Sequence, residues 1–307
     1  MITSYKKALF DLTVSWSDLV QQVHIPDKLY KYQSFYLNNG EDNPFWKNNI
    51  GGEFHLSLAK EFEDINDCRP DISETEIKNL LKKEIINICN FDENYKKNIF
   101  DEIDRVVNEN FTKKIIDNYQ SSIRIGCFTD SFCNQKMWGK YGNNATGFCI
   151  EYDTNKSVLF NQFTLPVLYT EKTYNISSSV VGFICNFFAD KIINTKIKES
   201  KYDKIQKATY IPIFIKNASK WSFEREYRMF LLQHMSIGQD IKKMDDYTDE
   251  KHNIDLSGAI TAIYLGENFE QNKNSEKLFN VMLELQNQNG YFDIYKIENN
   301  DVVKIIK

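Results

Sequence analysis

The densest group of side chains able to do chemistry lies at residues 221–228, where the sequence reads WSFEREYR. An apolar run follows, so residues 226–232 are predicted to form a strand. Side chains alternate between the two faces of a strand, which places Glu226 and Arg228 on one face, and Glu224 extends that charged face. A carboxylate beside a fixed guanidinium stays ionised and oriented, as a catalytic or substrate-binding group requires. A structural ion pair is the equal alternative.

Two aromatic side chains lie in a short segment between two predicted strands. Residues 137–142 read MWGKYG, and Trp138 and Tyr141 are three positions apart on one face of a short helix or turn. They have the geometry to stack on a base or a nicotinamide ring, although packing in the core is the favoured alternative. Cys127 and Cys149 lie in the flanking strands. With no histidine close by in sequence, we expect both to be buried fillers rather than nucleophiles.

The sequence lacks the common motifs of metal and phosphate chemistry. The four histidines are scattered, and the six cysteines include no CxxC pair, so no metal site is predicted and reduced thiols are expected. There is no GxGxxG, no GKS/T and no GxSxG segment, which disfavours phosphate-loop nucleotide chemistry and serine hydrolysis. The spacings typical of nucleases are absent as well.

Composition predicts a folded protein of one elaborated domain over residues 1–307, because 42% of the residues are hydrophobic and 14% are aromatic. The net charge of −5 argues against a general nucleic-acid coat. Acids are interspersed in the most basic segment, 196–207, so we interpret it as a solvated helix face. No apolar run approaches the roughly 20 residues that a membrane span needs, which predicts a cytoplasmic protein without a membrane partner.

The order of predicted elements indicates an α+β fold with a mixed or antiparallel sheet rather than repeating βαβ units. The predicted strands are 29–32, 53–58, 124–129, 147–152, 165–169, 226–232, 259–265 and 291–297. The predicted helices are 5–23, one starting at Ser73, 92 to about 118, 178 to about 207, and 275–288. The two in residues 73–120 are predicted to be an antiparallel helical insertion that serves as a lid or as a surface for a protein partner.

Several short motifs resemble, in the expected order, a bacterial family catalogued as domain of unknown function family 2971. They are LYKYQS (29–34), the Asn66-Asp67 turn, CFTD (127–130), MWGKYG with GFCIEYD (137–153), WSFEREYR (221–228) and AIYLGEN (262–268). Members usually continue the Asn-Asp turn with Pro-Phe and an acid, whereas this chain has Cys68-Arg69-Pro70. The family name implies no activity.

A second resemblance is to ADP-ribosyltransferases, including the toxin type that modifies DNA. Those enzymes look like a split sheet whose first strand carries a basic or histidine residue beside an aromatic one. A middle strand carries Ser or Thr, and a late strand begins with the catalytic Glu, often as Glu-x-Glu. The corresponding segments here, in the same order, are Tyr30-Lys31-Tyr32, Phe54-His55-Leu56-Ser57 and Glu224-Arg225-Glu226.

This resemblance implies an NAD-dependent ADP-ribosyltransferase or NAD glycohydrolase that acts as an effector of bacterial defence or as a toxin. NAD would be the substrate, and a protein or a nucleic acid would be the acceptor. Loss of nicotinamide leaves an oxocarbenium-like ribose that Glu226 would stabilise, while Glu224 would activate the acceptor. Lys31 and Arg228 would bind the phosphates. The remaining predicted NAD-binding residues are Ser57 and the aromatic residues Tyr32, Trp138 and Tyr141, one of which would stack on nicotinamide.

The alternative is a non-enzymatic module that senses a nucleotide or a phage protein through the aromatic segment and the 73–120 helices. The enzyme hypothesis requires Lys31, Ser57 and Glu226 to line one cleft, whereas the module hypothesis leaves them apart. We also expect Trp221 to be buried, where it would fix the backbone that presents Glu226 and its neighbour.

Overall fold

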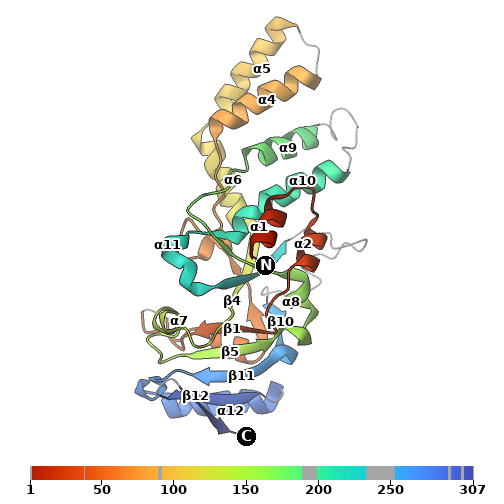
Figure 1. Ribbon diagram of the computed structural model, residues 1–307. Helices are drawn as coiled ribbons and strands as arrows, with labels where there is room; N and C mark the ends of the chain where they lie inside the picture. The colour runs from red at the N-terminus through yellow and green to blue at the C-terminus, as the bar shows by residue number, and fades with distance from the viewer. Residues whose placement is uncertain are drawn as a thin grey trace. The chain divides into compact units, whose positions relative to one another are not determined.

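The computed structural model describes residues 2–37, 39–88, 92–188, 199–232, 253–289, 292–298 and 301–306 (Figure 1). Contacts within the chain divide it into two compact units. Unit 1 comprises Met1–Gln22, Leu58–Ser122 and Leu168–Asn217. Unit 2 comprises Val23–Ser57, Ile123–Val167 and Ala218–Lys307. Each unit is described here by itself.

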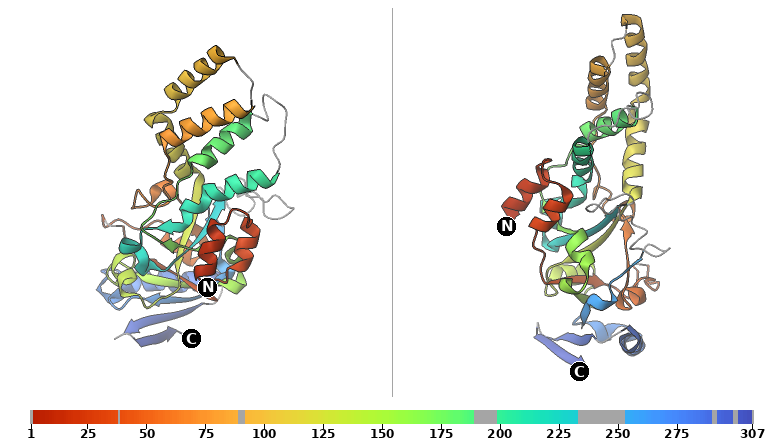
Figure 2. Two further views of the ribbon diagram at one scale, coloured as in Figure 1. Left: turned by 45° about the horizontal axis from the view of Figure 1, so that its top comes forward. Right: turned by 90° about the vertical axis from the view of Figure 1, so that its right-hand side faces the viewer.

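Unit 1 is mostly helical. Its helices are α1 (Ile2–Phe10), α2 (Trp16–Gln22), α4 (Glu74–Ile88), α5 (Glu93–Val106), α6 (Glu109–Ser122), α9 (Ser177–Phe188) and α10 (Glu199–Tyr210). Two short strands, β7 (Leu168–Tyr169) and β8 (Ile215–Lys216), pair in parallel. Helices α4 and α5 lie side by side (Figures 1 and 2), and Lys82 joins Asp104 across them at 2.7 Å. Ser73 caps α4 as predicted, because its Oγ accepts from the backbone N–H of Glu76 at 3.3 Å.

Two of the predicted helices are broken by local polar turns. The segment 5–23 is divided between α1 and α2 because Asp11 accepts from both the backbone N–H and the hydroxyl of Thr13, at 2.9 and 2.6 Å. The segment 92–118 is divided between α5 and α6, where Asn108 accepts from the N–H of Phe111 at 3.1 Å and starts a new helix. The predicted helix 178–207 is seen as α9 and α10, and residues 189–198 between them lie outside the described residues.

The basic segment of α10 is not uniformly solvated, contrary to the sequence interpretation. Lys207 is 1% exposed, and its ammonium donates to three carbonyl oxygens at the end of α1 and beyond: Ala8 at 2.8 Å, Asp11 at 2.7 Å and Val14 at 2.6 Å. A lysine ammonium has three N–H donors, so all of them are used. Lys207 therefore stabilises the turn that separates α1 from α2.

Within the described residues, unit 2 is built on a nine-stranded mixed sheet in the order β13-β12-β11-β5-β1-β4-β9-β6, with β3 also paired to β4. The strands are β1 (Lys28–Gln33), β3 (Ser57–Leu58), β4 (Ile123–Thr129), β5 (Phe148–Asp153), β6 (Thr164–Pro166), β9 (Glu226–Leu232), β11 (Ile260–Leu265), β12 (Asp293–Glu298) and β13 (Asp301–Ile306). Strands β11 and β12 are parallel, whereas β1, β4, β5 and β9 pair antiparallel. The predicted α+β fold with a mixed sheet is confirmed.

The sheet opens between β1 and β4. These strands share one register pair, Tyr30 with Thr129, whereas β1 pairs with β5 from Lys28 to Gln33. Strand β4 in turn pairs with β9 along its whole length, from Ile123 to Thr129. The two strands therefore pair over a much shorter length than either pairs with its other neighbour.

The helices of unit 2 cover both faces of the sheet. They are α3 (Trp46–Ile50), α7 (Gln135–Lys140), α8 (Val158–Phe163), α11 (Ala218–Trp221) and α12 (Ser275–Asn289). Residues of α3, α8 and α12 pack on one face in the main core, where Phe54 and Phe128 are stacked with centroids 4.8 Å apart. On the other face, Met137 and Trp138 of α7 pack against Tyr30 and Tyr32.

The predicted strand 53–58 is broken at Leu56. Residues before the break form β2 (Glu53–His55), which pairs with β10 (Asn253–Asp255) in a separate two-stranded sheet, and residues after it form β3. Because Leu56 is fully buried, the chain bends there to place its side chain in the core. His55 and Ser57 were expected to share a face of one strand, but they lie in strands with different partners.

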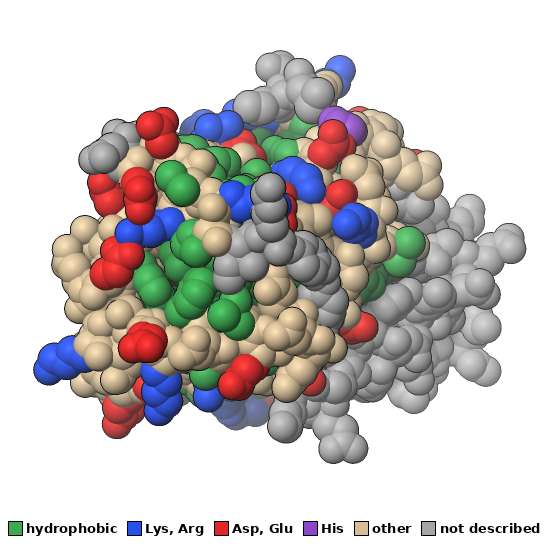
Figure 3. All heavy atoms as spheres, turned by 90° about the horizontal axis from the view of Figure 1, so that it is seen from below, with side chains coloured by type: hydrophobic (Ala, Val, Ile, Leu, Met, Phe, Trp, Pro, Cys, Tyr) green, Lys and Arg blue, Asp and Glu red, His purple; other side chains and the backbone are tan. Residues whose placement is uncertain are grey.

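Strand β13 forms one edge of the large sheet. Val302, Val303 and Ile305 on it are each about two-fifths exposed. Figure 3 looks onto this end of unit 2, where hydrophobic side chains gather among charged ones.

Candidate functional site

Glu226 and Arg228 form a buried, two-point ion pair at the start of β9. Arg228 Nε donates to Glu226 Oε1 at 2.7 Å and Arg228 Nη2 donates to Oε2 at 3.1 Å. The strand spans the predicted residues, and both side chains lie on one face as alternation requires. Their side chains are 5% and 0% exposed. A planar guanidinium held by two parallel bonds fixes the orientation of the carboxylate.

Cys127 and Lys31 lie next to this ion pair, Cys127 on the same face of the sheet and Lys31 on the opposite face from Tyr30, with its Nζ 4.9 Å from the centroid of the Phe54 ring. Cys127 is directly opposite Arg228 in the sheet, on the face that carries Glu226. Burial raises the pKa of Cys127 well above the usual value, and the negative charge of Glu226 adds to the effect. The Nζ atom of Lys31 lies 3.4 Å from the Cys127 carbonyl oxygen, at the opening between β1 and β4. Burial lowers the pKa of Lys31, and attraction to Glu226 opposes that change.

Thr129 lies beside this ion pair, and the sequence reasoning did not single it out. It is opposite Glu226 on β9 and opposite Tyr30 on β1, so the three side chains share a face. Thr129 is 1% exposed, and its Oγ1 atom has no hydrogen-bond partner among the described residues. The sequence feature that could have indicated Thr129 is its position at the end of the predicted strand 124–129, in the CFTD motif. Only the register of three non-consecutive strands shows that it meets Glu226.

The structure does not bring Ser57 to this ion pair. Strand β3 pairs with β4, and Arg124 Nη1 donates to the Leu56 carbonyl at 3.2 Å, which places this contact near the start of β4. The Leu56 side chain lies against Gly126 of β4, three residues before Thr129. Ser57 therefore follows a residue that packs on the part of β4 before Thr129.

Glu224 precedes the ion pair in a 3₁₀ turn, Ser222–Glu224, and is 3% exposed. The hydroxyl of Tyr141 donates to Glu224 Oε1. Between the two glutamates, Arg225 has a left-handed backbone with φ of 47° and pairs with Asp130 at 2.6 Å. A non-glycine residue in that region is strained and is held there by its surroundings. The strain and the ion pair to Asp130 together set the turn that leads from Glu224 into β9.

Three of the predicted aromatic residues have defined structural roles around this turn. Trp221 is 7% exposed, which confirms its predicted burial, and Lys140 Nζ lies 4.8 Å from its ring centroid. Trp138 packs edge-on against Tyr32 with centroids 4.9 Å apart. Trp138 also donates from Nε1 to the carbonyl of Phe132 at 2.8 Å. These bonds hold the chain around residues 131–134 against β1.

The Tyr32 hydroxyl takes part in the same arrangement. It donates to the Ser131 carbonyl at 3.0 Å and accepts from the Asn134 N–H at 3.1 Å. Asn134 in turn donates from Nδ2 to the Phe223 carbonyl at 2.5 Å. The loop after β4 is therefore bonded both to β1 and to the turn that carries Glu224.

Other candidates from the sequence lie elsewhere. Asp67 of the Asn66-Asp67 turn pairs with Lys216 at 3.2 Å inside unit 1. Among the residues that the structure describes, no three His, Cys, Asp or Glu side chains converge as a metal site would require. Within the same residues, no helix combines the length and the apolar composition needed to cross a bilayer.

Residues 137–229 match a family model described as "Protein of unknown function (DUF2971)". The matched region runs from α7 to β9, so it includes Tyr141, Glu224, Glu226 and Arg228. It supports the first of the two sequence resemblances, to the domain of unknown function family. Neither a curated protein nor a solved structure was found to match the chain.

Proposed function

We propose that this protein consumes NAD, as an ADP-ribosyltransferase or an NAD glycohydrolase. One observation carries the proposal: β9 and β4 bring an oriented carboxylate and an unpartnered hydroxyl together on one face of the sheet, and β1 holds an amine at its boundary with β4. These groups are Glu226 on β9, Thr129 on β4 and Lys31 on β1. The three residues are far apart in sequence, so local folding alone does not explain why they lie near one another.

The chemistry needs few groups. The bond from the ribose C1′ to the nicotinamide nitrogen breaks, nicotinamide leaves with the electron pair, and positive charge develops on C1′ and the ring oxygen. The Glu226 carboxylate, whose direction Arg228 sets, stabilises that charge. An acceptor oxygen or nitrogen then bonds to C1′ and gives its proton to Glu224, and for a glycohydrolase the acceptor is water. One such carboxylate contributes on the order of 10²–10³ in rate.

The structure changes two of the assignments made from sequence alone. Arg228 is fully buried and uses two nitrogens on Glu226, so we assign it as a positioning residue rather than a phosphate ligand. Thr129 takes the place that the resemblance gave to Ser57. Its free hydroxyl is able to donate to a ribose oxygen, while the ammonium of Lys31 supplies the attraction for a phosphate.

The test is nicotinamide release from NAD by purified protein, measured by chromatography. Thr129→Val is the sharpest variant, because it removes a hydroxyl that has no partner in the described structure and so should leave stability unchanged. We expect release to fall at least tenfold. Thr164→Val is its matched control: Thr164 is also buried with an unpartnered hydroxyl, but it lies opposite Met229, on the other face of β9. Equal release by the two variants would remove Thr129 from the mechanism, and no release by the parent protein would refute the proposal.

A non-enzymatic binding module is the second candidate, and the burial of Glu226 and Arg228 favours it. A pair that is 5% and 0% exposed is also what a structural ion pair looks like. The same assay separates the two functions. A module binds NAD or another nucleotide, as measured by calorimetry, without releasing nicotinamide.

A further inference from the structure

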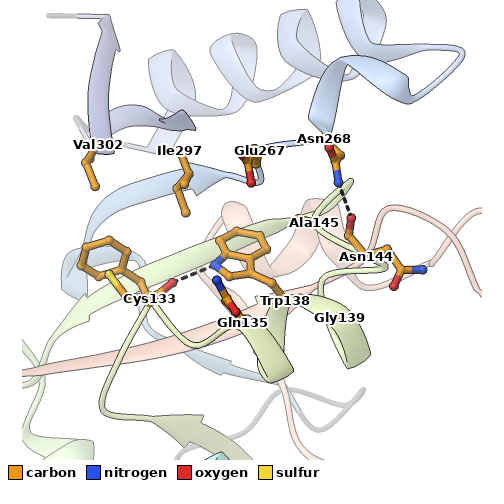
Figure 4. A pocket seen from close by; sticks show the side chains of 11 residues that line it. Cys133, Gln135, Trp138, Gly139, Asn144, Ala145, Glu267, Asn268, Ile297 and Val302 are labelled. Carbon is orange, nitrogen blue, oxygen red and sulfur yellow. Dashed lines mark hydrogen bonds between the residues drawn. The ribbon is translucent and has the colours of Figure 1, made fainter. Parts of the chain in front are cut away.

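A cavity of about 390 Å³ lies in unit 2 and does not include Glu226 or Arg228 among its lining residues (Figure 4). Trp138 lies on one side, and Ile297 and Val302 of the β12–β13 pair lie on the other. Phe132 is also among the lining residues. Its volume is within the range of about 300–1,000 Å³ typical of small-molecule sites. An aromatic wall facing an aliphatic wall suits a flat ring inserted between them.

The aromatic wall is rigid before any ligand arrives. Trp138 is held by its bond to the Phe132 carbonyl and by its contact with Tyr32. Phe132 stacks on Tyr264 with centroids 4.2 Å apart and planes 9° apart, and Tyr264 stacks on Tyr295 at 5.3 Å and 16°. A pre-formed wall reduces the ordering cost of binding.

One end of the cavity is polar and strained. Asn143, Asn144 and Ala145 have consecutive positive φ angles of 48°, 53° and 61°. The segment after β11 clamps this loop, because Asn268 donates from Nδ2 to the Asn144 carbonyl at 3.0 Å and from its backbone N–H to the Ala145 carbonyl at 2.9 Å. Strain of this kind persists only where neighbours enforce it, and it clusters at ligand sites.

The charge of the residues that line the cavity determines which class of ligand it favours. Glu267 is the charged residue among the described residues that line the cavity; it is exposed, and Figure 4 shows it between Ile297 and Asn268. A carboxylate accepts N–H bonds and repels phosphate. The side-chain amide of Gln135 has both donors and an acceptor to offer a ring edge.

We propose that this cavity binds an uncharged planar heterocycle of the nucleobase type, stacked on Trp138 and Phe132, with its N–H donors on Glu267. A free base or nucleoside meets these requirements, whereas a nucleotide places its phosphate against a carboxylate unless the phosphate points out of the cavity. The site does not depend on NAD consumption, because its residues are separate from Glu226, Thr129 and Lys31.

Cys133 provides a direct readout, because it lines the cavity and is exposed. Burial of part of the thiol raises its pKa, so iodoacetamide labelling is best followed at about pH 9, by mass spectrometry of the peptide. The probes are guanosine, adenosine and cytidine, with GMP, AMP and CMP for comparison. We expect at least one nucleoside to slow Cys133 labelling at least fivefold in a saturable way, and the matching nucleotide to protect less.

Two variants with matched controls make the test specific. A Cβ at Gly139, a lining residue, meets no atom within 4 Å, so Gly139→Leu starts from open space and should obstruct the cavity and abolish protection. Gly258→Leu also starts from open space but is not among the lining residues, and it should leave protection unchanged. Glu267→Gln should weaken protection about tenfold, and Glu270→Gln, three residues away and paired with Lys296, should leave it unchanged.

No protection by any nucleoside at millimolar concentration would overturn the proposal. Undiminished protection in Gly139→Leu would place the ligand elsewhere, and stronger protection by nucleotides than by nucleosides would refute the selection against phosphate. In Thr129→Val, nucleosides should protect Cys133 as they do in the parent protein. A failure of nucleoside binding is therefore distinguishable from a failure of NAD consumption.

Discussion

Replacing Glu226 by Gln is expected to destabilise unit 2 strongly, apart from any effect on catalysis. The side chain keeps its shape and one acceptor oxygen, but Arg228 then holds a guanidinium charge at 0% exposure without the carboxylate that faces it. Removing one partner of a buried ion pair costs about 3–5 kcal/mol. At about 2–4 °C per kcal/mol for a unit of this size, the midpoint of thermal unfolding falls by roughly 6–20 °C. Loss of an ion pair at the protein surface would lower this midpoint by only a few degrees.

The assay is urea unfolding followed by tryptophan fluorescence. Three of the four tryptophans, Trp46, Trp138 and Trp221, belong to unit 2, so the signal reports mainly on the unit that contains the pair. The slope of the unfolding free energy against urea concentration should be the same in the variant and the parent. An unchanged slope would show that the variant alters the free energy of unfolding and not the surface exposed on unfolding.

A double-mutant cycle separates the ion pair from other effects. Arg228→Met removes the charge and keeps much of the apolar length, and it should cost a similar amount because it leaves the Glu226 carboxylate buried. The double variant, Glu226→Gln with Arg228→Met, should lose less than the sum of the single variants by at least about 1 kcal/mol. Additive losses, or a midpoint shift below about 2 °C for Glu226→Gln, would refute a coupled buried pair.

Three further predictions address other parts of the chain. Trp221→Ala should cost about 3–5 kcal/mol by urea unfolding, because a 7% exposed ring is lost. Lys207→Met should lower the stability of unit 1 by at least about 2 kcal/mol, measured by circular dichroism on thermal unfolding, since three carbonyl oxygens lose their donor. For Glu151, burial alone would raise the pKa, but bonds from Thr261 and Tyr264 outweigh it and hold the pKa below 4.5. Its stabilisation is therefore full above pH 4.5 and is lost as the pH falls through the folded-state pKa, so the midpoint difference from Glu151→Gln should shrink below pH 4.5.

Patterns within a few residues were readable from the sequence. Alternation after Trp221 predicted the strand β9 and the shared face of Glu226 and Arg228, and the structure shows both. Aromatic content predicted that Trp221 is buried. These features depend on the period of a strand and on the hydrophobic effect, which act locally and leave a mark in the order of residues.

The positions at which helices and strands are interrupted were harder to predict from the sequence. The break at Leu56 depends on the core that receives this side chain, and the division between α1 and α2 is reinforced by Lys207, almost two hundred residues away in sequence. Hydrophobic periodicity continues through such breaks, because the apolar residues on both sides still face a core. The sequence therefore predicted longer strands and helices than the chain forms.

Tertiary structure alone decided which groups meet at the candidate site. Thr129 lies opposite Glu226 because β4 pairs with β9 in one register, and Lys31 reaches Cys127 because β1 and β4 separate after a single pair. A shift of one residue in either pairing would turn Thr129 to the other face of the sheet. Register is set by packing summed over the whole sheet, whereas the sequence of one strand carries only its own alternation. The sequence could therefore name Glu226 and Arg228 on one strand, but not Thr129 on the neighbouring one.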